Sequence, residues 1–315
     1  MRELELLSHI YRSNPALPVG VSIPPGDDMG AVILDGATVL VTVDQLADGV
    51  HVDLTNTPAE KVGRKAITRN LSDVAAMAAK PIGAVAAACL PEAFGDDKAK
   101  ALFDAMRATA KSFNCPLIGG DISMWDQRLI LTVTVFARPD GIDPVLRSGA
   151  QVGDAVYVTG KLGGSLITTD DPPGYIHHLD FTPRIDLARE LAAEPTTRPH
   201  AMIDLSDGLA LDLPRLCEQS CVCAEMDTDK LPLSAASRVA AKRSGRPAWQ
   251  HALGDGEDYE LCFTAPPGAI PNQVAAVPIT PIGRVIKTKP GPRVSVRLPD
   301  GTLADTSGLG WEHVG

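Results

Sequence analysis

Seven aspartates in short polar motifs are the residues of this chain whose type and spacing could do chemistry. They are Asp27, Asp28, Asp44, Asp73, Asp121, Asp204 and Asp207, in the motifs GDD, VTVDQL, NLSD, GGD and MIDLSDGL. If these carboxylates met in one cleft, they would repel one another strongly at short range. Divalent cations would remove that cost, and oxygen-rich sites of this kind suit Mg²⁺ with substrate phosphates completing its coordination. The aspartates therefore predict an enzyme that uses Mg²⁺ and a phosphate-bearing substrate.

Taken singly, each of these motifs also has a plain structural interpretation. GDD is typical of a hairpin turn, GGD of a loop, and SDGL of a helix start with Ser206 as the N-cap and Asp207 in the first turn. The sequence contains no P-loop, no dinucleotide-binding glycine motif and no protein-kinase signature. If the chain uses ATP, it does so with a less common architecture, and only the combination of motifs points to it.

Composition sets the broad class. With 315 residues, 44% of them hydrophobic, the chain is long enough for two domains with sizeable cores. The Pro- and Gly-rich stretch 139–149 is the best boundary, so we expect domains at 1–147 and 148–315. A formal charge of −10 argues against nucleic acid or an anionic membrane as a main partner.

Three features of the sequence bear on location. The start MRELELLSHI has no signal-peptide pattern. No apolar window approaches the ~18 residues that a membrane span requires. The six cysteines are few and typical of small core residues in a reducing compartment. We therefore expect a cytoplasmic protein.

The first half is expected to position its aspartates on strands and one long helix. Strands are predicted at 38–46, 83–90 and 129–137, and helices at 57–79 and 96–114. Thr57, Pro58 and Glu60 form a capping-box pattern at the start of the first helix. Asp73 then lies at the edge of that helix's apolar stripe, which is an unusual place for a carboxylate without a partner. GGD at 119–121 is expected to be a turn.

The second half repeats the mixture of strands and helices. Strands are predicted at 154–160, 259–265, 279–286 and 293–298, and helices at 183–194, 206–220 and 233–244. Pro214 is expected to break or kink the second of these helices. The segment 170–180 has loop composition, and we interpret His177 and His178 as loop residues. The fold class is mixed α/β in two blocks, without the regular βαβ series of a doubly wound sheet.

The motifs occur in an order that resembles the thiamine-monophosphate kinase family, within the superfamily of aminoimidazole ribonucleotide synthetase. The matching segments are GDD at 26–28, the spaced set Thr42, Asp44, Leu46, Gly49 and His51, NLSDVAAMAAKP at 70–81, LIGGD at 117–121, RSGAQVGDAVYVTG at 147–160, MIDLSDGLALDL at 202–213 and GEDYELCF at 256–263. The resemblance runs from Gly26 to Trp311. It implies a two-domain fold in which N-terminal strands of two copies form a dimeric β-barrel, and hence a homodimer.

The resemblance also implies roles for individual positions. Positions matching the family's Mg²⁺ ligands are Asp28, Thr42, Asp44, Asp73, Asp121, Asp204 and Asp207. Positions matching its ATP contacts are Gly120, Asp121, Arg147 and Ser206, and those matching its thiamine monophosphate contacts are His51, Glu257 and Trp311. The cofactor implied is Mg²⁺, several ions of it, with ATP as co-substrate. Without the resemblance, Trp311 is more simply explained as an anchor of the C-terminus and His51 as a structural histidine.

The chemistry of these residue types fits direct phosphoryl transfer. Such transfer depends on positioning and charge neutralisation, and Arg147 offers a planar cationic fork to a phosphate. The acceptor is itself a phosphate monoester, largely dianionic at neutral pH, so no general base is assigned. Trp311 could stack on the cationic thiazolium, and Glu257 could pair with an amino group or offset its charge.

Some residues depart from the family's pattern, and other activities stay open. Val43 replaces a hydroxyl residue, Asp255 replaces a glycine, and Arg64 and Arg69 bring positive charge into the NLSD helix. These departures bear on the exact acceptor. One alternative is a sister ATP-dependent enzyme of the superfamily, acting on another small phosphorylated substrate. A selenophosphate synthetase would be expected to have a reactive cysteine near its N-terminus, but no cysteine precedes Cys89. The other alternative is a nucleotide-binding protein without catalysis.

Overall fold

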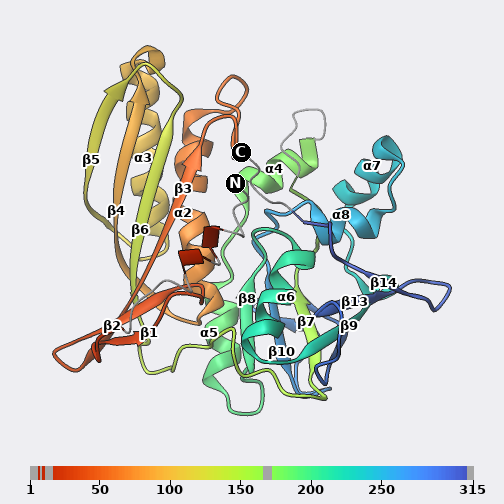
Figure 1. Cartoon of the computed structure of the whole chain (residues 1–315). Helices are drawn as coiled ribbons and strands as arrows, with labels where there is room; N and C mark the ends of the chain where they lie inside the picture. The colour runs from red at the N-terminus through yellow and green to blue at the C-terminus, as the bar shows by residue number, and fades with distance from the viewer. Residues whose placement is uncertain (1–5, 8, 11–16, 166–171, 311–315) are drawn as a thin grey trace.

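The computed structural model describes residues 6–7, 9–10, 17–165 and 172–310, which form two sheets with helices between and beside them (Figure 1). The N-terminal sheet has the strand order β1-β2-β3-β6-β4-β5. Its strands are β1 (Val21–Ile23), β2 (Gly30–Leu34), β3 (Ala37–Ala47), β4 (Lys80–Pro91), β5 (Leu117–Trp125) and β6 (Ile130–Arg138). The helices of this half are α2 (Ala59–Ala76) and α3 (Asp96–Ser112).

The C-terminal sheet has the strand order β14-β13-β9-β12-β7-β10-β8, with β11 paired to β12. Its strands are β7 (Ala155–Thr159), β8 (Ala201–Asp204), β9 (Cys223–Asp227), β10 (Leu261–Ala265), β11 (Gln273–Val274), β12 (Val277–Ile286), β13 (Val294–Arg297) and β14 (Leu303–Asp305). The helices are α4 (Pro172–Asp180), α5 (Ile185–Ala193), α6 (Leu209–Gln219), α7 (Ala235–Ser244) and α8 (Ala248–Gly254). No helix in the described part of the chain has the length and apolarity needed to cross a membrane.

Helix α2 is the element that joins the two halves. It packs against β3 and β6 of the first sheet and against β8 of the second. Its apolar residues Ile67, Leu71 and Val74 are fully buried, as their helical spacing predicts. The remaining faces of α2 are therefore free to carry polar side chains into the space between the sheets.

Strand β3 brings its own polar residues to the same place. Its side chains alternate, so Thr42 and Asp44 share the face of the buried Leu40 and Leu46, while Val43 points the other way. This inner face is the one that α2 covers. The predicted strand 38–46 is confirmed, and its alternation places one carboxylate beside α2.

Two predictions about irregular segments are wrong. GGD at 119–121 is not a turn but the middle of β5, an edge strand parallel to β4. The strands approach so closely that a Cβ on Gly120 would lie 2.0 Å from the carbonyl oxygen of Ala86, so this glycine permits close approach and not a turn. The segment 170–180 is not a loop where it is described, because Pro172–Asp180 forms α4. Prolines suit the first turn of a helix, and α4 is held by packing against α2 and α7.

Two helix details also differ from expectation. Helix α2 begins at Ala59 after Pro58, without a side-chain cap, and ends at Ala76, so the predicted range 57–79 was too long at both ends. Ala78 has a left-handed φ of 52°, which terminates the helix. Pro214 lies inside α6, which runs unbroken from Leu209 to Gln219.

Candidate active site

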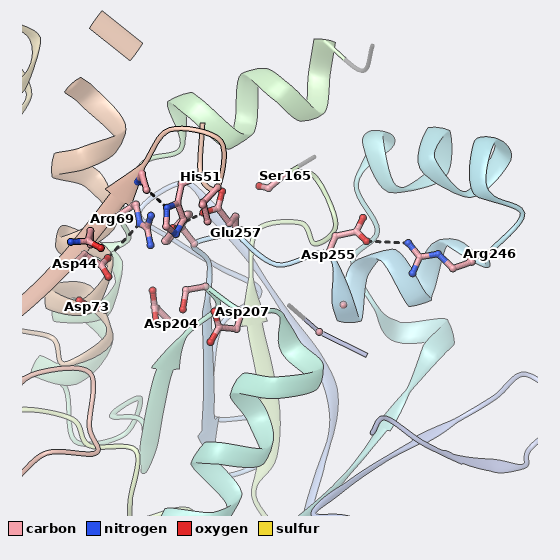
Figure 2. A pocket seen from close by; sticks show the side chains of 17 residues that line it. Asp44, His51, Arg69, Asp73, Ser165, Asp204, Asp207, Arg246, Asp255 and Glu257 are labelled. Atoms are coloured by element: carbon pink, nitrogen blue, oxygen red, sulfur yellow. Dashed lines mark hydrogen bonds and ion pairs between the residues drawn. The ribbon is translucent and has the colours of Figure 1, made fainter. Parts of the chain in front are cut away.

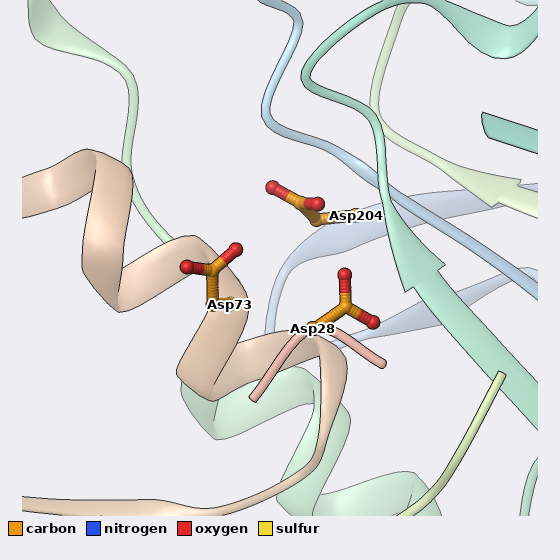
Figure 3. A group of neighbouring side chains, drawn as sticks. All are labelled: Asp28, Asp73 and Asp204. Carbon is orange, nitrogen blue, oxygen red and sulfur yellow. The ribbon is translucent and has the colours of Figure 1, made fainter. Parts of the chain in front are cut away.

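Three carboxylates from distant parts of the chain meet between the two sheets (Figure 3). Asp28 precedes β2, Asp73 lies on α2, and Asp204 ends β8. One oxygen from each lies within 4.8 Å of the others. The prediction that Asp28, Asp73 and Asp204 converge therefore agrees with the geometry of the fold.

The electrostatics of this acidic cluster favour a bound cation. Burial, and then the charges of neighbouring aspartates, raise the pKa of Asp73 well above its usual range. Burial, with Asp28 and Asp212 nearby, does the same to the pKa of Asp204. Three hard oxygen donors held this close, with the ionised forms of Asp73 and Asp204 disfavoured, are a donor set that fits a divalent metal such as Mg²⁺.

Hydroxyl groups orient two of these carboxylates. The Thr42 hydroxyl donates to Asp73, and the Ser72 hydroxyl donates to Asp204 at 2.7 Å. Each bond fixes one carboxylate oxygen and leaves the other for a ligand. In this structure Thr42 thus serves the cluster through Asp73.

Arg147 clamps the third carboxylate from the other side. Its Nη2 and Nε donate to the two oxygens of Asp28 at 2.7 and 3.2 Å. Its backbone N–H donates to Asp27, 3.1 Å from Oδ2. Burial and the neighbouring Asp28 raise the pKa of Asp27 to about 6. Arg147 therefore ties the GDD motif to the start of the second half of the chain.

A cavity of about 940 Å³ opens beside the acidic cluster (Figure 2). The residues that line it and that the sequence had singled out are Asp44, His51, Asp73, Asp204, Ser206, Asp207 and Glu257. Asp44 Oδ2 lies 3.5 Å from Arg69 Nε, and Asp207 pairs with Arg215 at 2.6 Å. The cavity is large enough for a nucleotide-sized or drug-sized ligand.

Beneath Asp207 lies a further carboxylate that the sequence motifs did not single out. Asp212, on α6, accepts a hydrogen bond from the Asp207 backbone N–H at 3.1 Å and pairs with Arg215 at 2.8 Å. Burial and the charge of Asp207 raise the pKa of Asp212 to about 8. Arg215 thus bridges two acids and orients Asp207 toward the cavity.

Glu257 lies in a second cluster, farther along α2, where its charge is compensated. Its Oε2 lies 2.6 Å from Lys65 Nζ and 2.6 Å from His178 Nδ1. Burial alone would raise the pKa of Glu257, but the Lys65 charge and the His178 hydrogen bond hold it well below its usual range. Glu257 has a left-handed φ of 55°, which turns its side chain into this cluster. We call Lys65, His178 and Glu257 the buried ion cluster.

His178 is therefore not a loop residue, as the sequence had suggested, but a fully buried one on α4. Its neighbour His177 also has a partner, since its Nε2 lies 3.1 Å from the Asp258 carbonyl oxygen. His51 lines the cavity, and its Nδ1 accepts a hydrogen bond from the Ala47 N–H at 3.0 Å.

Some predicted site residues do not join the cavity within one chain. Gly120 and Asp121 lie on β5, and the strand order puts three interstrand steps, about 14 Å, between Gly120 and Asp44. Gly120 is in line with the inner face of the sheet, and Asp121, which pairs with Ala87, is the next residue along β5. Because side chains alternate along a strand, Asp121 points to the outer face of the sheet. Trp311 lies outside the described residues.

The sequence contains a pattern that marks Lys65, although none of the motifs above includes this residue. Lys65, Arg69, Ser72 and Asp73 fall at the spacing i, i+4, i+7 and i+8, which is one face of a helix. Each has a partner across the space between the sheets or on β3. A polar stripe beside the apolar stripe of α2 thus marks the wall of the site.

Comparison with known proteins decides the family. The model of the AIR synthase related protein, N-terminal domain, matches residues 26–138. A thiamine-monophosphate kinase of Rhodopirellula baltica is 35% identical over 286 residues, covering 87% of this chain and 85% of that protein. The chain belongs to the thiamine-monophosphate kinase family. A second family member, from Halobacterium salinarum, is 34% identical over 302 residues, covering 94% of this chain and 97% of that protein.

The family's solved structures agree in fold. The structure described as AaThiL complexed with AMPPCP and TMP superposes with a TM-score of 0.82 and 29% identity, covering 99% of this chain and 97% of that one. The predicted family and the mixed α/β architecture of its superfamily are thereby confirmed for this thiamine-monophosphate kinase family member.

Proposed function

We propose that the protein transfers the γ-phosphate of ATP to thiamine monophosphate, forming thiamine diphosphate and ADP. The observation that carries the proposal is one cavity that is lined both by Asp73 and Asp204 of the acidic cluster and by Glu257. The AaThiL structure was solved with the ATP analogue AMPPCP and with TMP. The acidic cluster suits a polyphosphate and its cations, and Glu257 suits a hydrogen-bond donor on the organic part of a ligand.

In the proposed reaction, a non-bridging oxygen of the acceptor phosphate attacks the γ-phosphorus. The bond from that phosphorus to the β,γ-bridging oxygen breaks, and its electron pair leaves with ADP. The acceptor is already an oxyanion at neutral pH, so no side chain has to remove a proton. The protein's contribution is to position two anions that otherwise repel.

The chain's residues divide this work. Asp28, Asp73 and Asp204 would hold Mg²⁺, with Asp44 and Asp207 on the cavity wall as further ligands. When bound, Mg²⁺ supplies neutralisation of the phosphate oxygens. Ser206, on the cavity wall, and Arg147 would contact ATP. Arg147 would also help to stabilise the charge of the transition state, and it keeps Asp28 in place.

The substrate end of the cavity is proposed to bind the organic part of thiamine monophosphate. Lys65 and His178 hold Glu257 ionised through its Oε2, and its Oε1 would accept a hydrogen bond from an amino group of the substrate. His51 would contribute a ring N–H at the same wall. Trp311, predicted as a third contact, remains part of the proposal.

A homodimer is part of the same proposal. Large apolar side chains are exposed on β5, the edge strand of the N-terminal sheet, with Ile118 67%, Ile122 56% and Met124 57% exposed. Burying them against a second copy would remove apolar surface from water, as in the dimeric barrel implied by the family. Gly120 and Asp121 lie on the same edge strand, so we propose that they act from that interface. We also propose that the chain divides into an N-terminal unit at 1–147 and a C-terminal unit at 148–315.

Phosphorus NMR of a reaction mixture tests the function directly. With ATP, Mg²⁺ and thiamine monophosphate, we expect the resonances of ADP and of thiamine diphosphate to grow together. Thiamine in place of its monophosphate is the matched control and should give neither. ADP release that does not depend on the acceptor, or binding of ATP without turnover by folded protein, would overturn the proposal.

A further inference from the structure

Arg69 lines the cavity from the middle of the polar stripe on α2 (Figure 2). The residue is only 9% exposed, and its Nε lies 3.5 Å from Asp44 Oδ2. It stands one helical turn from Lys65 and one from Asp73, between the buried ion cluster and the acidic cluster. Arg69 therefore occupies the border between the two chemistries of the cavity.

The guanidinium of Arg69 has unused hydrogen-bonding capacity. Within the described part of the chain, its Nε and Nη1 are buried and make no hydrogen bond. Buried donors are satisfied in nearly all native structures, so unsatisfied ones call for a ligand or water. The Asp44 contact supplies charge but not the directed bonds that a planar, five-donor group can make.

The other arginine on the cavity wall differs in both respects. Arg246 has a side chain that is 50% exposed, and its Nη2 lies 3.5 Å from Asp255 Oδ1. Water already solvates such a group, so it gains less from a new partner. Of these two arginines, Arg69 is the desolvated one with donors to spare.

We infer that Arg69 binds the phosphate group of the acceptor and so selects a phosphorylated substrate over the corresponding free alcohol. This inference rests on the proposed function. The acceptor phosphate must meet the donor between the acidic cluster and the residues that hold its organic part, and Arg69 lies on that border, within electrostatic reach of Asp44 and Asp73 on one side and Glu257 on the other. Arginine matches phosphate with two parallel hydrogen bonds, and here it also offsets the carboxylates that would repel a dianion.

The test compares two ligands on three proteins. Isothermal titration calorimetry would measure the dissociation constants of thiamine monophosphate and of thiamine, with Mg²⁺ present and ATP absent. For Arg69→Met we expect the affinity for thiamine monophosphate to fall about tenfold to about a hundredfold, the usual range for a lost charged hydrogen bond. Its affinity for thiamine should stay within about threefold, because thiamine carries no phosphate.

Arg64→Met is the matched control. Arg64 lies on the same helix but pairs with Asp180 at 2.6 Å and donates to the Phe181 carbonyl, away from the cavity wall. It should leave the ratio of the two affinities unchanged. Arg69→Lys keeps the charge but not the fork, and we expect an intermediate loss confined to thiamine monophosphate. It also carries the test if Arg69→Met fails to fold.

The outcomes separate two failures. If the unmodified protein binds thiamine monophosphate no better than thiamine, the proposed function itself is wrong. If it prefers the phosphorylated ligand but the Arg69 variants keep that preference, or lose both ligands equally, Arg69 has a structural role and the inference is wrong while the function stands.

Discussion

The acidic cluster and the buried ion cluster lie about two helical turns apart along α2, beside one cavity, yet buried charge is handled in opposite ways in the two clusters. Asp28, Asp73 and Asp204 crowd negative charge together, and burial raises the pKa of the last two. Glu257 is equally shielded from water, but Lys65 and His178 hold its pKa well below the usual range. One site is incomplete without a ligand, whereas the other is complete in itself.

The difference shows which residues a ligand can use. A compensated carboxylate is held rigidly and stays an acceptor, so it suits recognition of a hydrogen-bond donor on the organic part of a ligand. In the acidic cluster Arg147 compensates only Asp28, and the burial of carboxylates without a cation of their own destabilises the protein until metal ions bind, so this cluster suits reversible binding. The same helix, α2, supplies Lys65 to one cluster and Asp73 to the other, which couples the two sites at a fixed spacing.

The largest effect is expected for Asp73→Asn, which tests whether the acidic cluster needs a metal ion. We expect thiamine diphosphate formation to fall about a thousandfold or more, since a metal site contributes several kcal/mol to stabilising a transferred phosphoryl group. The metal-free protein should become more stable, because a desolvated charge is removed while the Thr42 hydroxyl keeps an acceptor. Mg²⁺ at a hundred times its dissociation constant should stabilise the unmodified protein by about 2.7 kcal/mol, and the variant by less.

Thermal unfolding with and without Mg²⁺ measures both effects. Asp300→Asn, at an exposed position, is the control and should leave activity and the Mg²⁺ shift unchanged. A variant that keeps the full Mg²⁺ shift would show that the acidic cluster does not hold the metal.

Lys65→Met tests the compensated side. It leaves the Glu257 carboxylate buried beside His178, and breaking a buried ion pair from one side costs about 3–5 kcal/mol of unfolding free energy. His178 becomes the nearest available cation, since its ring lies 2.6 Å from Glu257. The loss should therefore shrink as the pH falls and His178 takes up a proton.

Urea unfolding at several pH values checks this. The double variant Lys65→Met with Glu257→Gln removes both charges and should recover part of the lost stability. Equal destabilisation in the single and double variants would mean that Lys65 matters for packing and not for the charge of Glu257.

The sequence supported much of the fold because its elements follow local rules. The alternation in β3 and the apolar stripe of α2 were predicted from local patterns, and both are found. GGD failed because glycine is ambiguous: Gly120 serves a close approach of strands, which only the partner strand reveals. The α4 segment failed because its stability comes from packing on α2.

The site was predictable to the extent that it lies in continuous motifs. Asp28, Asp204 and Asp207 stand in short patterns that stand out in the sequence. The pairing of Lys65 with His178 and Glu257 joins α2, α4 and the segment before β10, and no local rule connects residues so far apart. The free donors of Arg69 are likewise a property of the packed structure.

Asp258 is intermediate between the two clusters, because its buried carboxylate is only partly compensated, and the effect on stability depends on pH. Its carboxylate accepts bonds from the N–H groups of Gly163 and Gly164 at 3.0 and 3.1 Å. Burial, with Glu260 and Asp255 nearby, still raises its pKa from 3.8 to about 8. A carboxyl group whose folded-state pKa is raised stabilises the fold below its unfolded pKa, and that contribution is lost as the pH rises through the folded value.

Asp258→Asn should therefore gain stability relative to the unmodified protein as the pH rises from about 4 to about 8, at up to about 1.4 kcal/mol per pH unit. The amide oxygen can accept from both glycines in the position of Oδ1, but its NH2 group then lies in the position of Oδ2, 3.0 Å from the Gly163 nitrogen. This contact between two donors lowers the stability of the variant equally at every pH, so it leaves the slope unchanged. Urea unfolding at about pH 5, 6, 7 and 8 gives the free energy of unfolding at each pH, and hence its change per pH unit. Parallel curves for the two proteins would show that Asp258 is ionised throughout.

The smallest loss of stability is expected for an ion pair whose charges are already solvated by water. Lys61 pairs with Asp180 across α2 and α4, but its side chain is 43% exposed. Exposed ion pairs contribute about 0–1 kcal/mol, so Lys61→Met should cost less than about 1 kcal/mol and nothing at high salt, where exposed charges are screened. Urea unfolding at low and high salt measures it. A loss of stability as large as that of Lys65→Met would mean that the exposed ion pair between Lys61 and Asp180 fixes the position of α4. The buried ion cluster would then depend on that pair and not on its own charges.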